Sequence, residues 1–101
     1  MVINLRYYST VAAVTKKANE DIELKEGTTV EDVIKMLVEK YGNTFEKGLF
    51  FEGFYGDKKV RTPNLFLNKS RIQWTQDYPE GLKTVLKNGD MLWMGLIVGG
   101  G

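Results

Sequence analysis

The sequence predicts an α+β roll, in which a mixed β-sheet carries one main helix across one face. Residues 2–8 and 21–25 alternate apolar and polar side chains, which is typical of strands with one buried face. Residues 28–42 place apolar side chains along one side of a long helix, and residues 91–98 form an apolar run. A strand pair, a helix and an apolar last strand together favour a sheet packed on one helix.

The first two strands are close in the sequence, so we expect them to pair antiparallel. Residues 9–20 lie between them and contain neither glycine nor proline. They are expected to form a loop with a short helical turn.

The clearest element is the helix that follows Gly27. Thr28 is expected to cap its N-terminus, with Glu31 as the reciprocal half of a capping box. Gly42 stands at its end, where a positive φ is favoured. The apolar side chains between them recur at helical spacing in one stripe: Val30, Val33, Ile34, Leu37 and Tyr41.

Residues 43–64 follow no single period. Aromatic side chains alternate irregularly with Gly48, Gly53 and Gly56. The glycines argue against a long helix, and the aromatic rings argue against disorder. We expect an irregular insertion that packs its rings against the edge of the core. An exposed aromatic surface for a partner is the alternative.

The remaining elements return the chain to the sheet. Residues 65–67 and 71–74 are predicted to be short strands, and Leu82 to Leu86 to be a helical turn. Asn88-Gly89 is a strong tight-turn signal before the last strand. Since that strand is apolar on both faces, we expect it to be central in its sheet. This order is that of the β-grasp fold, in one domain that spans residues 1–101.

The composition excludes several classes of function. The chain has 101 residues, 14 Lys and Arg against 13 Asp and Glu, and no cysteine or histidine. It therefore lacks disulfides, thiolate metal sites, a cysteine nucleophile and the histidine that is the usual general base. The acid pairs Glu31/Asp32 and Asp21/Glu23 are better explained by a helix start and a solvated strand, so we expect no metal site and no active site of its own. The balanced charge argues against nucleic acid as a primary ligand.

No apolar stretch is long enough to cross a membrane, and the N-terminal residues lack the layout of a signal peptide. Together with the absence of cysteine, this leads us to expect a cytoplasmic protein without a membrane partner.

The last seven residues hold four of the 11 glycines, and the sequence ends in Gly99, Gly100 and Gly101. Residues without side chains form a thin, flexible tail, which can thread a narrow channel and present a carboxylate there. Without histidine or cysteine, the carboxylate of Gly101 is the reactive group that remains. A frayed end or a cloning remnant is the alternative.

Four segments carry a resemblance to a known family: VINLRYY, IELKEGTTVEDVIKMLVEKYG, NLFLNKSRI and LKNGDMLWMGLIVGGG. They resemble the ubiquitin-like sulfur carriers, namely the small subunit of molybdopterin synthase (MoaD), the thiamine sulfur carrier and the ubiquitin-related modifier. The resemblance covers residues 1–42 and 65–101 and fails across 43–64. Tails of this family often carry a proline and a small polar residue before Gly-Gly. Here Leu96, Ile97, Val98 and Gly99 stand instead, which leaves Gly100 and Gly101 as the matching pair.

The resemblance implies a sulfur carrier in molybdopterin (Mo/W cofactor) biosynthesis, whose Gly101 carboxylate is adenylated and converted to a thiocarboxylate. It implies two partners: a ubiquitin-activating-type adenylyltransferase that uses ATP, and the large subunit of molybdopterin synthase. The chain itself is expected to bind no cofactor. A tRNA-thiolation carrier and a ubiquitin-like protein modifier are alternatives, because the chemistry is shared up to the adenylate. An interaction module with an inert tail is a further alternative.

Period two divides the side chains of the last strand into two sets. The aliphatic set is expected to face the helix stripe: Leu92, Met94 and Leu96. The other set is expected to face outward beside the tail and to bind a partner: Met91, Trp93 and Ile97. In the alternative, residues 43–64 fold back and bury Trp93 in a second small core.

Overall fold

The computed structural model describes residues 1–95, except for the side chains of residues 53–55. Within them the chain forms seven strands, three α-helices and one 3₁₀ turn. The expected continuation of the last strand to residue 98 and the expected flexible tail at residues 99–101 lie outside the described residues.

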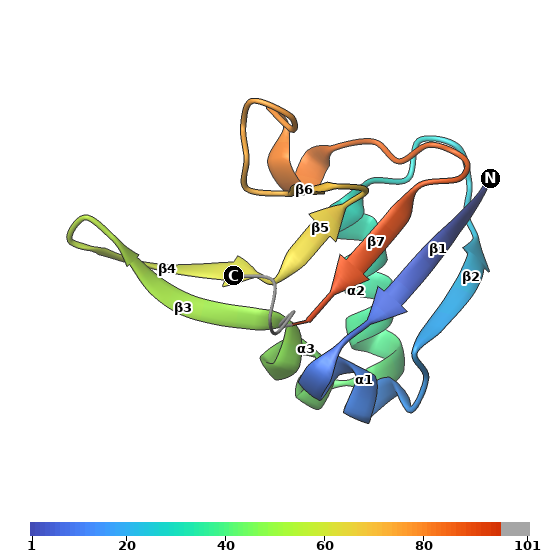
Figure 1. Ribbon diagram of the computed structural model, residues 1–101, viewed down its shortest axis with the longest axis horizontal. Helices are drawn as coiled ribbons and strands as arrows, with labels where there is room; N and C mark the ends of the chain where they lie inside the picture. The colour runs from blue at the N-terminus through green and yellow to red at the C-terminus, as the bar shows by residue number, and fades with distance from the viewer. Residues whose placement is uncertain (96–101) are drawn as a thin grey trace.

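Five strands form one mixed sheet, which confirms the predicted fold class (Figure 1). The last strand is central as predicted, because β7 pairs parallel with β1 and antiparallel with β5. The first two strands pair antiparallel, also as predicted. In order across the sheet, the strands are β2 (Asn19–Glu23), β1 (Val2–Tyr7), β7 (Met91–Met94), β5 (Leu65–Leu67) and β6 (Ser70–Arg71).

Helix α2 (Val30–Tyr41) crosses one face of this sheet and covers the core (Figure 1). Helices α1 (Ser9–Thr15) and α3 (Asn43–Leu49) pack against each other at one end of the sheet. The stripe of α2 meets the buried side of the strands as predicted, although Tyr41 is only partly buried. The shared core includes Leu5, Val33, Ile34, Leu37, Leu65, Leu92 and Met94.

Helix α2 is capped one residue later than the sequence analysis predicted. The Thr29 hydroxyl accepts a hydrogen bond from the Asp32 backbone N–H at 3.2 Å, and the Asp32 carboxylate accepts one from the Thr29 N–H at 3.0 Å. The prediction of Thr28 with Glu31 was wrong, because Thr28 donates instead to the Lys25 carbonyl and Glu31 lies against Lys83. The hydrogen bond from the Thr29 backbone lowers the pKa of Asp32.

The prediction that residues 43–64 are irregular was wrong, whereas the expected packing of aromatic rings against the core is confirmed for Phe45 and Phe50. The segment forms α3 and then a hairpin of β3 (Phe50–Tyr55) and β4 (Lys58–Pro63), which projects from the body as a separate two-stranded sheet (Figure 1). Helix α3 forms because Phe45 and Leu49, four residues apart, both enter the main core. Its Gly48 lets α1 approach, since a Cβ there would lie 3.1 Å from Thr10 Oγ1.

Three smaller differences concern the connections. Residues 9–20 hold a two-turn helix, α1, where a loop with one turn was expected. The strand predicted at 71–74 is reduced to β6, because Ile72 turns into the core. The helical turn expected near Leu82 is a single 3₁₀ turn, η1 (Gly81–Lys83). None of the helices in residues 1–95 is long and apolar enough to cross a membrane.

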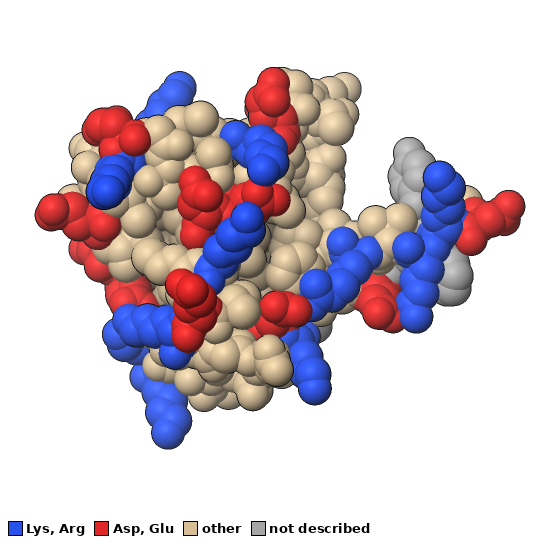
Figure 2. Space-filling model, turned by 180° about the vertical axis from the view of Figure 1, so that it is seen from behind, with Lys and Arg blue, Asp and Glu red and all other residues tan. Residues whose placement is uncertain are grey.

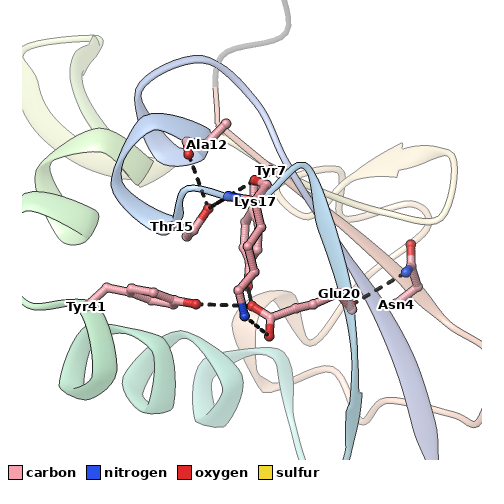
Figure 3. A network of polar contacts seen from close by, with 7 residues as sticks. All are labelled: Asn4, Tyr7, Ala12, Thr15, Lys17, Glu20 and Tyr41. Atoms are coloured by element: carbon pink, nitrogen blue, oxygen red, sulfur yellow. Dashed lines mark hydrogen bonds and ion pairs between the residues drawn. The ribbon is translucent and has the colours of Figure 1, made fainter.

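A carboxylate shared by two tyrosines ties β1, β2 and α2 together (Figure 3). Glu20 Oε2 accepts hydrogen bonds from the Tyr7 hydroxyl at 2.6 Å and the Tyr41 hydroxyl at 3.2 Å, and Lys17 Nζ lies 3.3 Å from Oε1. Burial by itself would raise the pKa of Glu20. The hydrogen bonds from Tyr7 and Lys17, with the charges of Lys17 and Lys40, outweigh burial and lower that pKa. Burial and the bond to Glu20 raise the pKa of Tyr7, which therefore stays a donor.

We expect Glu20→Gln to reduce the free energy of unfolding at pH 7 by about 1–2 kcal/mol, because two hydroxyls and an ammonium lose a charged acceptor. The pKa of Glu20 is lower in the folded state, so its contribution is present above the unfolded pKa and is lost as the pH falls through the folded pKa. Urea titrations should show a gap between wild type and variant at pH 7 that closes in acid. The exposed Glu23→Gln is the control, and a gap independent of pH would contradict this assignment.

Candidate functional site

The open face of the sheet carries the described members of the predicted partner surface. Met91 and Trp93 alternate with the buried Leu92 and Met94 and therefore lie on the side away from α2. The assignment of sides is thus confirmed for residues 91–94, and the role of these residues in binding stays a prediction. The other predicted site residues lie outside the described residues: Ile97, Gly99, Gly100 and Gly101.

Trp93 is only partly exposed, because Arg6 of β1 and Tyr8, the residue after β1, cover its indole ring. The ring of Tyr8 stacks on it, with centroids 5.7 Å apart and planes inclined by 12°. The guanidinium carbon of Arg6 lies 5.5 Å from the centroid of the indole. Residues 43–64, the alternative source of cover, form α3 and the separate hairpin. The indole Nε1 is buried and has no hydrogen-bond partner among the described residues.

Four side chains form a row across the open face, from β1 to β6. The strand register places Arg6 beside Trp93, Trp93 beside Phe66, and Phe66 beside Arg71. The guanidinium of Arg71 lies 4.8 Å from the ring centroid of Phe66, which repeats the arrangement of Arg6 on Trp93. The row therefore has an aromatic centre and cationic ends, and aromatic residues and arginine are the types enriched at protein interfaces.

Four residues of this face were not predicted from the sequence: Arg6, Tyr8 and Phe66, which adjoin Trp93, and Arg71, which packs on Phe66. The alternation of the first strand could have placed Arg6 on the open side, because Leu5 and Tyr7 on either side of it are buried. Alternation within one strand does not give the order of the strands, and that order is what brings Arg6 to Trp93.

Gly95, the last described residue before the glycine-rich end of the sequence, is closely packed against the body. Its backbone N–H donates to the carbonyl of Asn64 at 2.9 Å, and the preceding Met94 carbonyl accepts the Tyr8 N–H at 2.9 Å. Gly95 has a φ of 106°, and a Cβ at this position would lie 2.3 Å from the Tyr8 carbonyl oxygen. The close approach to Tyr8 and the positive φ both require glycine here. We call Gly95 the root of the tail.

The groups with shifted pKa values belong to contacts that stabilise the fold. The hydrogen bond from Lys83 lowers the pKa of Glu31, the hydrogen bond from Lys59 lowers that of Glu52, and burial raises that of Tyr78. No group of acidic side chains in residues 1–95 is arranged to hold a metal ion. What the described open face presents near Gly95 is a row of aromatic and guanidinium side chains.

No protein-family model matches the sequence, and no curated protein matches it. Solved structures do match. SAMP1, a small archaeal modifier protein from Haloferax volcanii, has a TM-score of 0.65 and 19% identity over 100% of both chains. SAMP1 from Methanosarcina acetivorans has a TM-score of 0.63 and 20% identity, over 99% of this chain and 96% of that one.

A putative molybdopterin converting factor subunit 1 from Pyrococcus furiosus has a TM-score of 0.60 and 20% identity, over 92% of this chain and 93% of that one. The chain has the β-grasp fold. At these identities the fold is what it shares with the modifier proteins and the converting factor. The resemblance to MoaD-like carriers and ubiquitin-related modifiers is thereby confirmed at the level of the fold.

In this β-grasp fold, we expect Gly95→Ala to lower the free energy of unfolding by about 2 kcal/mol or more, because it adds a clash with Tyr8 to a strained φ. Gly89→Ala is the matched control. Gly89 has a φ of 87° but open space around the position of its Cβ, so that substitution should cost only about 1 kcal/mol of backbone strain. Thermal and urea denaturation measure both variants. Equal losses would contradict the close packing of the root against Tyr8.

Proposed function

We propose that the chain is a sulfur carrier that acts through the carboxylate of Gly101 in molybdopterin biosynthesis. One observation carries the proposal: a β-grasp body fixes a chain segment at Gly95, and that segment ends in Gly99, Gly100 and Gly101. A putative molybdopterin converting factor subunit has the same fold over nearly the whole chain. The proposal takes Gly101 as the terminal residue of the working protein.

The chemistry requires an activated carboxylate, because a free carboxylate is a poor electrophile. A carboxylate oxygen of Gly101 attacks the α-phosphorus of ATP, pyrophosphate leaves, and a mixed anhydride with AMP results. A sulfur nucleophile then displaces AMP at the carbonyl carbon and leaves a thiocarboxylate, which can donate its sulfur. The chain contributes the carboxylate and a tail thin enough to enter a channel, and the partner enzyme binds ATP.

The same proposal assigns the open face to partners. Met91 and Trp93, with Ile97 beyond the described residues, would contact a ubiquitin-activating-type adenylyltransferase and the large subunit of molybdopterin synthase in turn. The row of Arg6, Trp93, Phe66 and Arg71 supports this assignment, because it presents aromatic and guanidinium groups a few residues from the root of the tail.

A protein modifier is the second candidate, and the SAMP1 structures favour it. The steps are the same up to the adenylate. In a modifier, the ε-amine of a target lysine attacks the activated carbonyl of Gly101 and an amide forms. A sulfur carrier for tRNA thiolation would share the thiocarboxylate and differ only in its acceptor.

Intact mass of the protein tests the proposal. After incubation with the adenylyltransferase of the same organism, ATP and a sulfide donor, the wild-type mass should rise by one oxygen-to-sulfur exchange. Deleting Gly101 should abolish the rise and leave the thermal midpoint unchanged. In the absence of ATP the wild-type mass should also stay constant. A wild-type mass that never changes under the full conditions would contradict the carrier function.

The modifier is distinguished in a cell lysate of the same organism supplied with ATP. Lys87 is the last basic residue of the chain, so trypsin would leave the segment 88–101 on a modified target lysine. Such remnants without a thiocarboxylate would favour the modifier over the sulfur carrier.

A further inference from the structure

The hairpin of β3 and β4 has a charged face on the helix side of the molecule. Lys59 Nζ lies 2.7 Å from Glu52 Oε2, and Arg61 donates to Glu46 of α3 at 2.8 Å. The Arg61 guanidinium also stacks on Phe50, 4.2 Å from the ring centroid. Figure 2, which shows the molecule from the helix side, has basic and acidic side chains along the projecting hairpin. The charges of this face are paired within the chain.

The opposite face of the hairpin continues the open face of the sheet. In β5, Leu65 and Leu67 are buried toward α2, so Phe66 lies on the open side. The same alternation of sides holds in β4. Pro63, which is buried, and Arg61, which pairs with Glu46 of α3, lie on the helix side. The residues between them therefore lie on the open side: Lys58, Val60 and Thr62.

This second face is apolar and exposed. Phe51 lies opposite Thr62, which makes it a diagonal neighbour of Val60 on the same face. The side chains of Phe51 and Val60 are 41% and 40% exposed. Lys58 is the charged residue of the face, and no salt bridge within the described residues engages it. We call Phe51, Val60 and Lys58 the hairpin face.

The base of the hairpin lies beside the root of the tail, and the hairpin face extends from it, with Phe51 near the base, Val60 further out and Lys58 at the tip. Asn64 joins β4 to β5, and its N–H donates at 2.8 Å to the carbonyl of Leu49, the last residue of α3 directly before β3. The carbonyl of the same Asn64 accepts the N–H of Gly95 at 2.9 Å. The base of the hairpin and the root of the tail are thus joined through one residue, so a protein that takes up the tail comes next to the hairpin.

We propose that the hairpin face is a second recognition surface for the enzyme that adenylates the tail, an inference that rests on the proposed function. The surface of that enzyme would offer an apolar patch to Phe51 and Val60 and a carboxylate to Lys58, which forms no salt bridge with another described residue. The row around Trp93 lies on the other side of the root. Contacts on both sides of Gly95 would fix the direction in which the tail enters the enzyme. They would also stabilise the β3–β4 hairpin, because a two-stranded sheet by itself is only marginally stable.

The test measures binding of the full chain to the purified adenylyltransferase of the same organism by titration calorimetry. Phe51→Ser should weaken binding about tenfold, as expected for an aromatic contact in an interface. The control Val85→Ser changes an apolar residue of comparable exposure, 53%, near the start of α2 and should bind as wild type.

Substitutions at two adjacent lysines test the proposed contact between Lys58 and a carboxylate of the enzyme. Lys58→Ala and Lys59→Ala each remove one positive charge at adjacent positions on opposite faces of β4. Lys58→Ala should weaken binding about threefold or more, and Lys59→Ala should leave it unchanged. Both positions are exposed, so circular dichroism should show the same fold for both variants.

The outcomes separate this inference from the function on which it rests. Normal binding by both Phe51→Ser and Lys58→Ala, with a wild-type chain that is still activated, overturns the hairpin face and leaves the carrier function standing. A wild-type chain that the enzyme neither binds nor activates overturns the carrier function, and the inference with it. A wild-type dimer in sedimentation velocity that Phe51→Ser abolishes would assign the face to a second copy instead and would overturn the choice of partner.

Discussion

Two backbone hydrogen bonds of Asn64 join the sheet, the hairpin and the root of the tail. In an extended residue the N–H and the carbonyl point to the same edge of the strand, and in Asn64 they reach Leu49 and Gly95 respectively. The residue before β3 and the residue after β7 therefore meet the same edge of the β4–β5 segment at Asn64. Strand β7 runs from Met91 to Met94, and the backbone at the next residue, Gly95, has a φ of 106°.

The architecture of the sheet and its helix could be predicted because each element has a clear period. The stripe of α2 and the apolar last strand identified both layers of the core, and the period of two in residues 91–94 assigned Leu92 and Met94 to it. The cap of α2 was misplaced by one residue, because Thr28 and Thr29 are equivalent in sequence. Only the tertiary contacts of Glu31 with Lys83 and of Thr29 with Val85 distinguish them.

Residues 43–64 could not be predicted, because two short elements of different period follow each other without a break. Helix α3 depends on Phe45 and Leu49 reaching a core built by other segments, and its Gly48 is explained only by the approach of Thr10. The site was predicted in part for a similar reason. The period of two assigned the side of Trp93, whereas Tyr8 and Arg6 reach that ring through the parallel pairing of β1 with β7.

The central physical claim is that the body holds the tail at Gly95 as firmly as it holds its own strands. Hydrogen exchange of the Gly95 amide tests this most directly, because that N–H donates to Asn64 in the folded state. The expected result is protection comparable to that of amides in the core, such as Leu92. Exchange of Gly95 as fast as that of the exposed Gly27 would contradict a fixed root and would leave the tail without a defined point of departure.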